Sequence, residues 1–321
     1  MAVQWTDRIG RRVKLRDLHI LLVAVQAGSM GKAASVLGVS QPAVWKALAD
    51  LEGALGVRLL ERSRQGVEPT LQGQALLKSG IAVFDELRRA VKELEFLNDP
   101  TVGELRVGCT EVLAGGFIAA VISQLSQRYP KATFDVIAAD RAALLGHHLR
   151  PRNIEVAVMP TEGVDVHADS DVEPLFDDGH IIMVGSESRW ARSRKVALAD
   201  LMDEAWILPP PGSIAGLSIA EAFRMSGLEP PRAHVVSFSV PLHYHLIASG
   251  RFLTMLPASM AHFGTHLPLR LLRIASPRHR RPVAIITLKN RTLSPLARLF
   301  IDCTREVARP LKRLSKHSDN K

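Results

Sequence analysis

The stretch VSQPAVWKALADLEGALGVRLLER, residues 39–62, decides the fold of the N-terminal part of this chain. Ser40 is a favourable N-cap and Pro42 suits a first helical turn, so the pattern predicts a helix from here to about Leu55. The apolar residues of this helix recur at helical spacing and form one face: Val44, Ala47, Leu48, Leu51 and Leu55. The other face carries Gln41, Trp45, Lys46 and Ala49 near the helix start.

Two shorter helices are expected before this helix and a hairpin after it. Apolar spacing predicts helices over residues 15–27 and 32–37, and residues 57–69 are typical of a small hairpin, or wing. A helix-turn-helix places its second helix in the major groove of DNA, where Gln41 can bond an adenine and Lys46 a phosphate or guanine. Arginines on the wing suit phosphate contacts. A three-helix unit can also be purely structural, and the motif alone leaves that alternative open.

A long helix over residues 71–98 is predicted to follow, capped by Thr70. Its apolar residues are spaced four and three apart: Leu76, Gly80, Val83, Leu87, Ala90, Leu94 and Leu97. Such a seam favours pairing with a helix of another chain, and the alternative is that it covers its own domain's core. Asn98-Asp99-Pro100 is expected to end the helix at a domain boundary.

The remainder of the chain and its composition indicate a globular α/β protein with a basic surface. Strands and helices alternate to about residue 310, which predicts a parallel sheet with helices on its faces. Hydrophobic residues make up 47% and the formal charge is +9, which favours a polyanionic partner. Only two cysteines, and no apolar signal or membrane-length stretch, are present. The cytoplasm is therefore the expected location, with no membrane partner.

The N-terminal motifs resemble those of the LysR-type transcriptional regulators. The matching residues are Gly28-Ser29, Ala33-Ala34, Leu37, Val39–Val44, Leu51-Glu52, Leu55–Arg62 and Pro69-Thr70. The resemblance implies a winged helix-turn-helix over residues 13–70, a dimerising linker helix over 71–98 and a two-subdomain effector domain over 103–310, shaped like a periplasmic binding protein. It implies a dimer or a dimer of dimers (a homotetramer) on double-stranded promoter DNA, a small-molecule effector and, as a further partner, RNA polymerase. The chain also looks similar to the branch of the family that controls sugar or aromatic-acid metabolism.

The resemblance also indicates which side chains meet DNA. Trp45 departs from the family pattern, because a serine or threonine is usual at that position. An indole there can lie against a sugar or a thymine methyl, or it can pack against the wing instead. The expected DNA-binding residues are Lys32, Ser40, Gln41, Pro42, Trp45, Lys46, Arg58, Arg62 and Arg64.

The effector is expected in a cleft between two subdomains, one of residues 103–160 and 268–310 and the other of residues 161–267. The chain would then cross between them near Pro160–Val164 and again near Thr265–Pro268. Helix starts after Thr110 and at Ser213 offer free backbone N–H groups, although both residues can merely cap their helices. The expected effector-binding residues are Thr110, Glu111, Ser213, Val240, Pro241 and Leu242.

The sequence predicts no function beyond the binding of DNA and of an effector. Between Glu229 and Asp302 the charged side chains are all basic, which indicates either an anionic effector or, as the favoured interpretation, a solvated positive face. The histidines lack metal-ligand spacing, Cys109 and Cys303 are expected to be small buried hydrophobes, and no catalytic motif occurs, so no metal, cofactor or enzymatic activity is expected. The alternatives are a constitutive DNA-binding protein without a ligand, and a small-molecule-binding protein or enzyme with an accessory basic domain.

Overall fold

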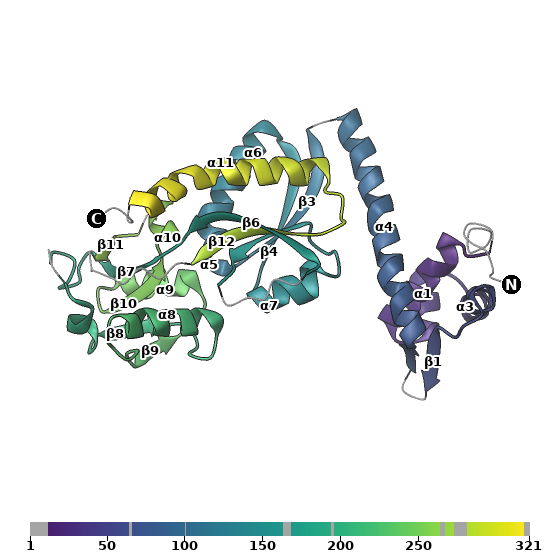
Figure 1. The fold of residues 1–321 in the computed structure, drawn as a ribbon, viewed down its shortest axis with the longest axis horizontal. Helices are drawn as coiled ribbons and strands as arrows, with labels where there is room; N and C mark the ends of the chain where they lie inside the picture. Colours follow the sequence, from purple (N-terminus) through teal and green to yellow (C-terminus); the bar gives the residue numbers. More distant parts are fainter. Residues whose placement is uncertain are drawn as a thin grey trace. The chain divides into compact units, whose positions relative to one another are not determined.

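A computed structural model describes residues 12–63, 66–99, 101–162, 168–193, 196–263, 267–272 and 281–317 (Figure 1). The chain forms two compact units, one up to Ala90 and one from Val91. Within the described residues no helix is both long and apolar enough to cross a lipid bilayer.

The first unit is a three-helix domain with a two-stranded wing. Its elements are α1 (Leu15–Ala27), α2 (Met30–Leu37), α3 (Gln41–Leu55), β1 (Leu60–Ser63), β2 (Gly66–Pro69) and the first part of α4 (Leu71–Asn98). Gly28 ends α1 and Gly56 ends α3, both in the left-handed conformation that glycine adopts without strain. Thr70 caps α4 as predicted, because its Oγ1 accepts the Gly73 N–H at 3.0 Å. The predicted helix-turn-helix and wing are confirmed, although the wing strand begins at Leu60 rather than Val57.

The second unit contains two five-stranded sheets, here called lobe I and lobe II. Lobe I has the strand order β4-β3-β5-β12-β6, with β3 (Val102–Cys109), β4 (Lys131–Ala138), β5 (Val156–Pro160), β6 (Ser170–Asp177) and β12 (Pro282–Leu288). Lobe II has the order β11-β7-β10-β8-β9, with β7 (His180–Gly185), β8 (Ala205–Leu208), β9 (Ala233–Val236), β10 (Phe252–Pro257) and β11 (Leu269–Leu272).

Each lobe also contains helices. In lobe I the helical segment after β3 comprises α5 (Glu111–Leu113), a π-helical stretch (Ala114–Ile118) and α6 (Ala119–Arg128), and β4 is followed by α7 (Arg141–Ala143) and a second π-helical stretch (Leu144–Leu149). The last helix, α11 (Pro295–His317), returns to lobe I and packs on β6 and α6. Lobe II carries a short 3-10 helix (Leu198–Leu201), α8 (Ile214–Met225), α9 (Val240–Ala248) and α10 (Ser259–His262).

Both predicted crossings between the lobes are wrong. The strand β6 lies beyond Pro160–Val164 in sequence, yet it pairs with β12 in lobe I along its whole length. The strand β11 lies after Thr265–Pro268, yet it pairs with β7 in lobe II. The chain therefore crosses at Asp178–Gly179 and again between β11 and β12, while Val164 and Thr265 lie outside the described residues.

The expectation of a wholly parallel sheet also needs correction, because both sheets are mixed. In lobe I, β3 is parallel to β4 and β5, but β12 runs antiparallel to β5 and β6. In lobe II, β10 is parallel to β8 but antiparallel to β7. The strands that run against their neighbours, β7 and β12, are the first strands after each crossing, where the chain enters a lobe.

Candidate DNA-binding and ligand-binding sites

The helix α3 has the two faces that its sequence predicts. Val44, Leu48 and Leu51 are fully buried in the core of the first unit, whereas Gln41 and Lys46 are exposed. Pro42 is exposed in the first turn of α3, Lys32 is exposed near the start of α2, and Arg58 is exposed just before β1. An exposed polar face opposite a buried one is what a helix that enters the major groove requires.

Ser40 holds the predicted N-cap position of α3 but not the predicted cap bond. Its backbone is extended, with φ −74° and ψ 148°, and its side chain makes no cap hydrogen bond. The backbone carbonyl of Ser40 accepts the first helical bond from the Ala43 N–H at 3.0 Å. The start of α3 is thus stabilised by the backbone and by Pro42, whose fixed φ suits a first turn.

Trp45 is half-buried and packs against the core cluster of the first unit. The indole therefore serves partly as a core side chain of the first unit. Its position on the first turns of α3 still leaves part of the side chain on the helix surface.

The wing is attached to α3 by a carboxylate. Glu52 Oε1 accepts the backbone N–H of Leu59 at 2.7 Å and that of Leu60 at 3.3 Å. On the other strand, Gly66 has φ +136° and a Cβ there would lie 2.4 Å from the Gly28 carbonyl oxygen, so only glycine fits. Arg62 stands on β1 opposite Val67, and Arg64 lies outside the described residues.

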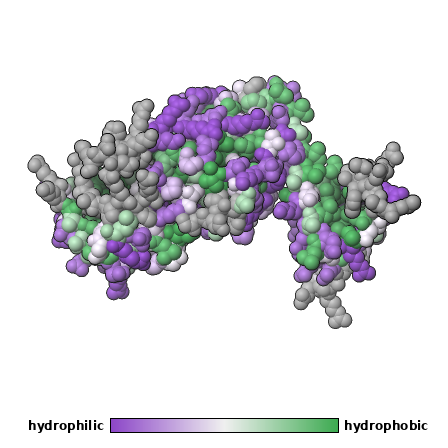
Figure 2. All heavy atoms as spheres, viewed as in Figure 1, coloured by the Kyte–Doolittle hydropathy of each residue, from purple (hydrophilic) through white to green (hydrophobic). Residues whose placement is uncertain are grey.

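The helix α4 divides into two parts. In its first part Leu77 and Gly80 are buried, and a Cβ at Gly80 would touch the side chain of Leu18, so this part covers its own domain's core. Further along, large apolar side chains between 42% and 71% exposed occur at Val83, Leu87, Val91, Leu94 and Leu97. Green, hydrophobic surface lies along α4 in Figure 2. The second part of the predicted seam thus has no apolar cover among the described residues.

A cavity of about 790 Å³ lies in the second unit and is lined by residues of both lobes. Four of the six predicted effector-binding residues line it, namely Thr110, Glu111, Ser213 and Val240. Pro241 and Leu242 do not belong to the lining, because they follow Val240 on the first turn of α9 and Leu242 is 42% exposed.

Thr110 and Ser213 behave differently at this cavity. The Ser213 hydroxyl caps α8: it accepts the Gly216 N–H at 3.1 Å and donates to the Pro210 carbonyl at 2.6 Å. The Thr110 hydroxyl makes no cap bond, and its oxygen is buried without a hydrogen-bond partner in the described structure. A buried hydroxyl without a partner costs free energy, so Thr110 offers a ligand an unused donor and acceptor.

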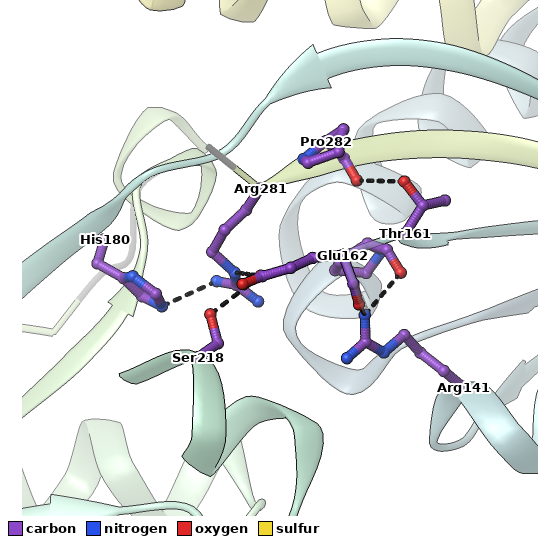
Figure 3. A network of polar contacts seen from close by, with 8 residues as sticks. Arg141, Thr161, Glu162, His180, Ser218, Arg281 and Pro282 are labelled. Carbon is purple, nitrogen blue, oxygen red and sulfur yellow. Dashed lines mark hydrogen bonds and ion pairs between the residues drawn. The ribbon is translucent and has the colours of Figure 1, made fainter. Parts of the chain in front are cut away.

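Two arginines that sequence reasoning did not assign to the site also line the cavity, Arg141 and Arg281 (Figure 3). The Arg141 guanidinium donates to the backbone carbonyls of Pro160, at 3.2 Å, and Glu162. Arg281 Nε lies 3.4 Å from a carboxylate oxygen of Glu162, and Arg281 Nη1 donates to His180 Nε2 at 3.2 Å. Both arginines are buried, and burial lowers the pKa of Arg141 to about 10, helped by repulsion from Arg281. Arg141 is therefore still charged at neutral pH.

Glu162 connects the lobes in the same network. It follows β5 of lobe I, and its Oε2 accepts the hydroxyl of Ser218, on α8 of lobe II, at 3.0 Å. Arg281 directly precedes β12, the strand by which the chain re-enters lobe I. Figure 3 shows Arg281 and Ser218 meeting at the Glu162 carboxylate, with His180 on the far side of Arg281 and Arg141 approaching Glu162 from the other side.

Three further side chains that the sequence brought into question, those of His243, Cys109 and Cys303, are buried. His243 Nε2 lies 3.0 Å from the Ser237 carbonyl, and burial lowers the pKa of His243. Cys109 and Cys303 are buried in the lobe I core, as expected. Among the described residues, no three His, Cys, Asp or Glu side chains gather as a metal ion would require.

This architecture defines a class of protein: a helix-turn-helix domain joined to a two-lobed domain with a cavity between the lobes. Residues 15–74 match the model of the bacterial regulatory helix-turn-helix protein, lysR family, and residues 98–309 match the LysR substrate binding domain. The chain therefore belongs to the LysR family of transcriptional regulators, as its N-terminal motifs suggested.

Individual relatives are similar over nearly the whole chain. The transcriptional regulator GbpR of Azospirillum brasilense is 29% identical, with 92% of this chain and 87% of GbpR covered. The crystal structure of CbnR, a LysR family transcriptional regulator, has a TM-score of 0.61 at 23% identity and covers 92% of this chain and all of CbnR. Full-length OxyR from Pseudomonas aeruginosa has a TM-score of 0.64 at 21% identity, covering 92% and 95%. At these identities the structures show a shared fold.

Proposed function

We propose that this regulator reads promoter DNA through α3 and the wing and responds to a small molecule in the cavity between its lobes. The observation that carries the first part is the exposure of Gln41 and Lys46 opposite the buried Val44 and Leu48. In this proposal the exposed Lys32 and Arg58 contact the DNA backbone, and Ser40 and Pro42 contact DNA at the start of α3.

The cavity supports a ligand-controlled regulator over a constitutive one. It has the volume of a drug-sized binding site and a mostly apolar lining with a few polar groups, which is typical of small-molecule sites. The buried Thr110 hydroxyl, which has no hydrogen-bond partner among the described residues, favours an occupant that supplies one. We further propose that the protein acts in the cytoplasm as a homodimer or homotetramer, through RNA polymerase and without catalysis of its own.

Titration of labelled DNA from the region upstream of the gene, at several salt concentrations, tests DNA reading. Lys46→Gln is expected to weaken binding to all sequences alike and to lower the salt slope by about 1, because one phosphate contact is lost. Gln41→Ala is expected to reduce discrimination among sequences instead. Lys78→Gln, an exposed position on α4, is the control and should change neither. Binding without salt dependence, or an effect of Lys78→Gln equal to that of Lys46→Gln, would contradict the proposal.

A further inference from the structure

We propose that the cavity binds a small organic acid, whose carboxylate is held by Arg141 and Arg281 in competition with the protein's own Glu162. This inference rests on the proposed function only in taking the cavity as the effector site. It adds the chemical class of the ligand and the residues that select it.

The two arginines are unusual in being buried at the wall of a cavity. Arg141 is 7% exposed and Arg281 is 6% exposed. Arginine is rarely buried without a partner, because transfer of a charge out of water is costly. Most of the other basic side chains of the Arg-rich interval from 229 to 302 are exposed or lie outside the described residues, so Arg281 is an exception to the solvated face expected there.

The carboxylates of Glu162 and Asp178 act on this pair of guanidiniums. The Glu162 carboxylate pairs with Arg281 and also attracts Arg141 electrostatically, and the Arg141 guanidinium bonds to the Glu162 backbone carbonyl. The buried Asp178 also interacts electrostatically with Arg281, yet its two oxygens accept from the N–H and hydroxyl of Ser259 and it does not line the cavity. An anion between the guanidiniums would relieve the repulsion between them.

The acidic residues in the cavity lining do little to neutralise the two buried arginines. Glu111 and Asp140 are exposed, and the Asp140 carboxylate accepts the Ala143 N–H as the cap of α7. Charges in contact with water are screened, whereas a carboxylate placed between buried guanidiniums is not. Charge-assisted bonds from arginine to a carboxylate are also strong and fixed in direction.

The rest of the lining defines the ligand's other end. The Thr110 hydroxyl is available for a ligand oxygen. The remaining wall is largely apolar and includes Val112, Ile214, Ile219, Phe238, Met255 and Leu256. A ligand with one acidic group on an apolar or sparsely hydroxylated body matches this distribution.

Because Glu162 contacts both lobes, binding of an anion next to it would affect how the lobes contact each other. Its carboxylate holds Arg281 and also accepts the Ser218 hydroxyl of lobe II. A ligand carboxylate that binds Arg281 would weaken the ion pair between Glu162 and Arg281. The hydrogen bond from Ser218 to Glu162, which is a contact between the lobes, would change as a result. Removal of the Glu162 charge should therefore favour the ligand carboxylate.

The test is thermal unfolding of the full-length protein at constant ionic strength with matched probes: benzoate against benzamide, succinate against succinamide, and gluconate against glucitol. A compound that binds only the folded state raises the melting temperature. We expect acids to stabilise the protein more than their neutral partners. Arg141→Gln should weaken an acid's binding by roughly tenfold or more, and Glu162→Gln should strengthen it. Arg224→Gln, which removes an exposed arginine of α8 outside the cavity, is the matched control and should leave binding unchanged.

Arg141→Gln leaves the Glu162–Arg281 ion pair in place, and its melting temperature without probe shows whether it folds. Should it fail to fold, Arg141→Lys and Glu162→Gln carry the test. Acids that bind no better than their neutral partners, including the case in which neither binds, overturn the inference. Neutral compounds that bind in the cavity regardless of Arg141 would also overturn it, while leaving the proposed function intact.

Discussion

The carboxylate of Glu52, near the end of α3, accepts the backbone N–H of Leu59 at 2.7 Å, just before the first strand of the wing. The same oxygen accepts the N–H of Leu60. One side chain of the reading helix thus fixes the position of the segment that carries Arg58. Glu52 belongs to the motif that suggested the family, and its carboxylate joins α3 to the wing, the two elements that we propose contact DNA.

Glu52→Ala is expected to lower the free energy of unfolding of the first unit by about 1–3 kcal/mol, because two backbone donors lose their acceptor. DNA affinity should fall as well, since the wing loses its attachment. Chemical denaturation followed by circular dichroism measures the first effect and DNA titration the second. Glu68→Gln, an exposed change on the other wing strand, is the control. Equal stability of the two variants would show that the bond to Leu59 contributes nothing.

Trp45→Ser is expected to change the DNA sequences selected from a random pool, because the indole is partly exposed near the start of α3, the helix that we propose reads DNA. It should also cost about 1–2 kcal/mol of stability, less than the loss of a fully buried tryptophan, since the ring is only half-buried. Val36→Ser, at a 72% exposed position of α2, is the control for both measurements. Selected sequences identical to those of the wild type would show that the indole acts in packing alone.

Leu94→Glu is expected to reduce the oligomer to a smaller species, because a charge in the exposed second part of the α4 seam would be buried when two such helices pair. Sedimentation velocity measures the change. Arg88→Glu places the same charge at an exposed position outside the seam and should leave the oligomer intact. An unchanged sedimentation coefficient for Leu94→Glu would place the interface elsewhere.

Cys109 and Cys303 are expected to resist alkylation by iodoacetamide in the native protein. Burial raises the pKa of Cys109 to about 12 and that of Cys303 to about 11, so the reactive thiolate is scarce at neutral pH. In the unfolded chain both thiols ionise near the ordinary value of 9.0, so their burial contributes a loss of stability as pH rises above it. Mass spectrometry before and after denaturation counts the modified thiols. Rapid modification of the native protein would instead indicate an accessible, reactive thiol.

Local features of the fold could be predicted from sequence, and long-range pairings could not. The caps at Thr70 and Ser213 and the two faces of α3 depend on residues a few positions apart, and these predictions hold. The lobe crossings depend on β12 pairing with β6, more than a hundred residues earlier, and apolar spacing carries no information about such partners.

The residues of the candidate site show the same difference between local and long-range features. Thr110 and Ser213 were found because each precedes a helix after a strand. Arg141 was missed because an arginine in a short helix is usually exposed, and only the folded lobes bury it beside Arg281. The interval rich in arginine did contain a cavity residue, but its sequence could not distinguish Arg281 from its solvated neighbours.

The place of β12 has a consequence for synthesis of the protein. It lies between β5 and β6 inside the lobe I sheet, although it follows all of lobe II in the chain. Lobe II is continuous from His180 to Leu272 and can assemble as soon as it leaves the ribosome. Lobe I must wait, with β5 and β6 unjoined, until residues up to Leu288 emerge. The ribosome thus completes the second lobe before the first, and a chain that stops at Leu272 would retain a foldable lobe II beside an open sheet prone to aggregation.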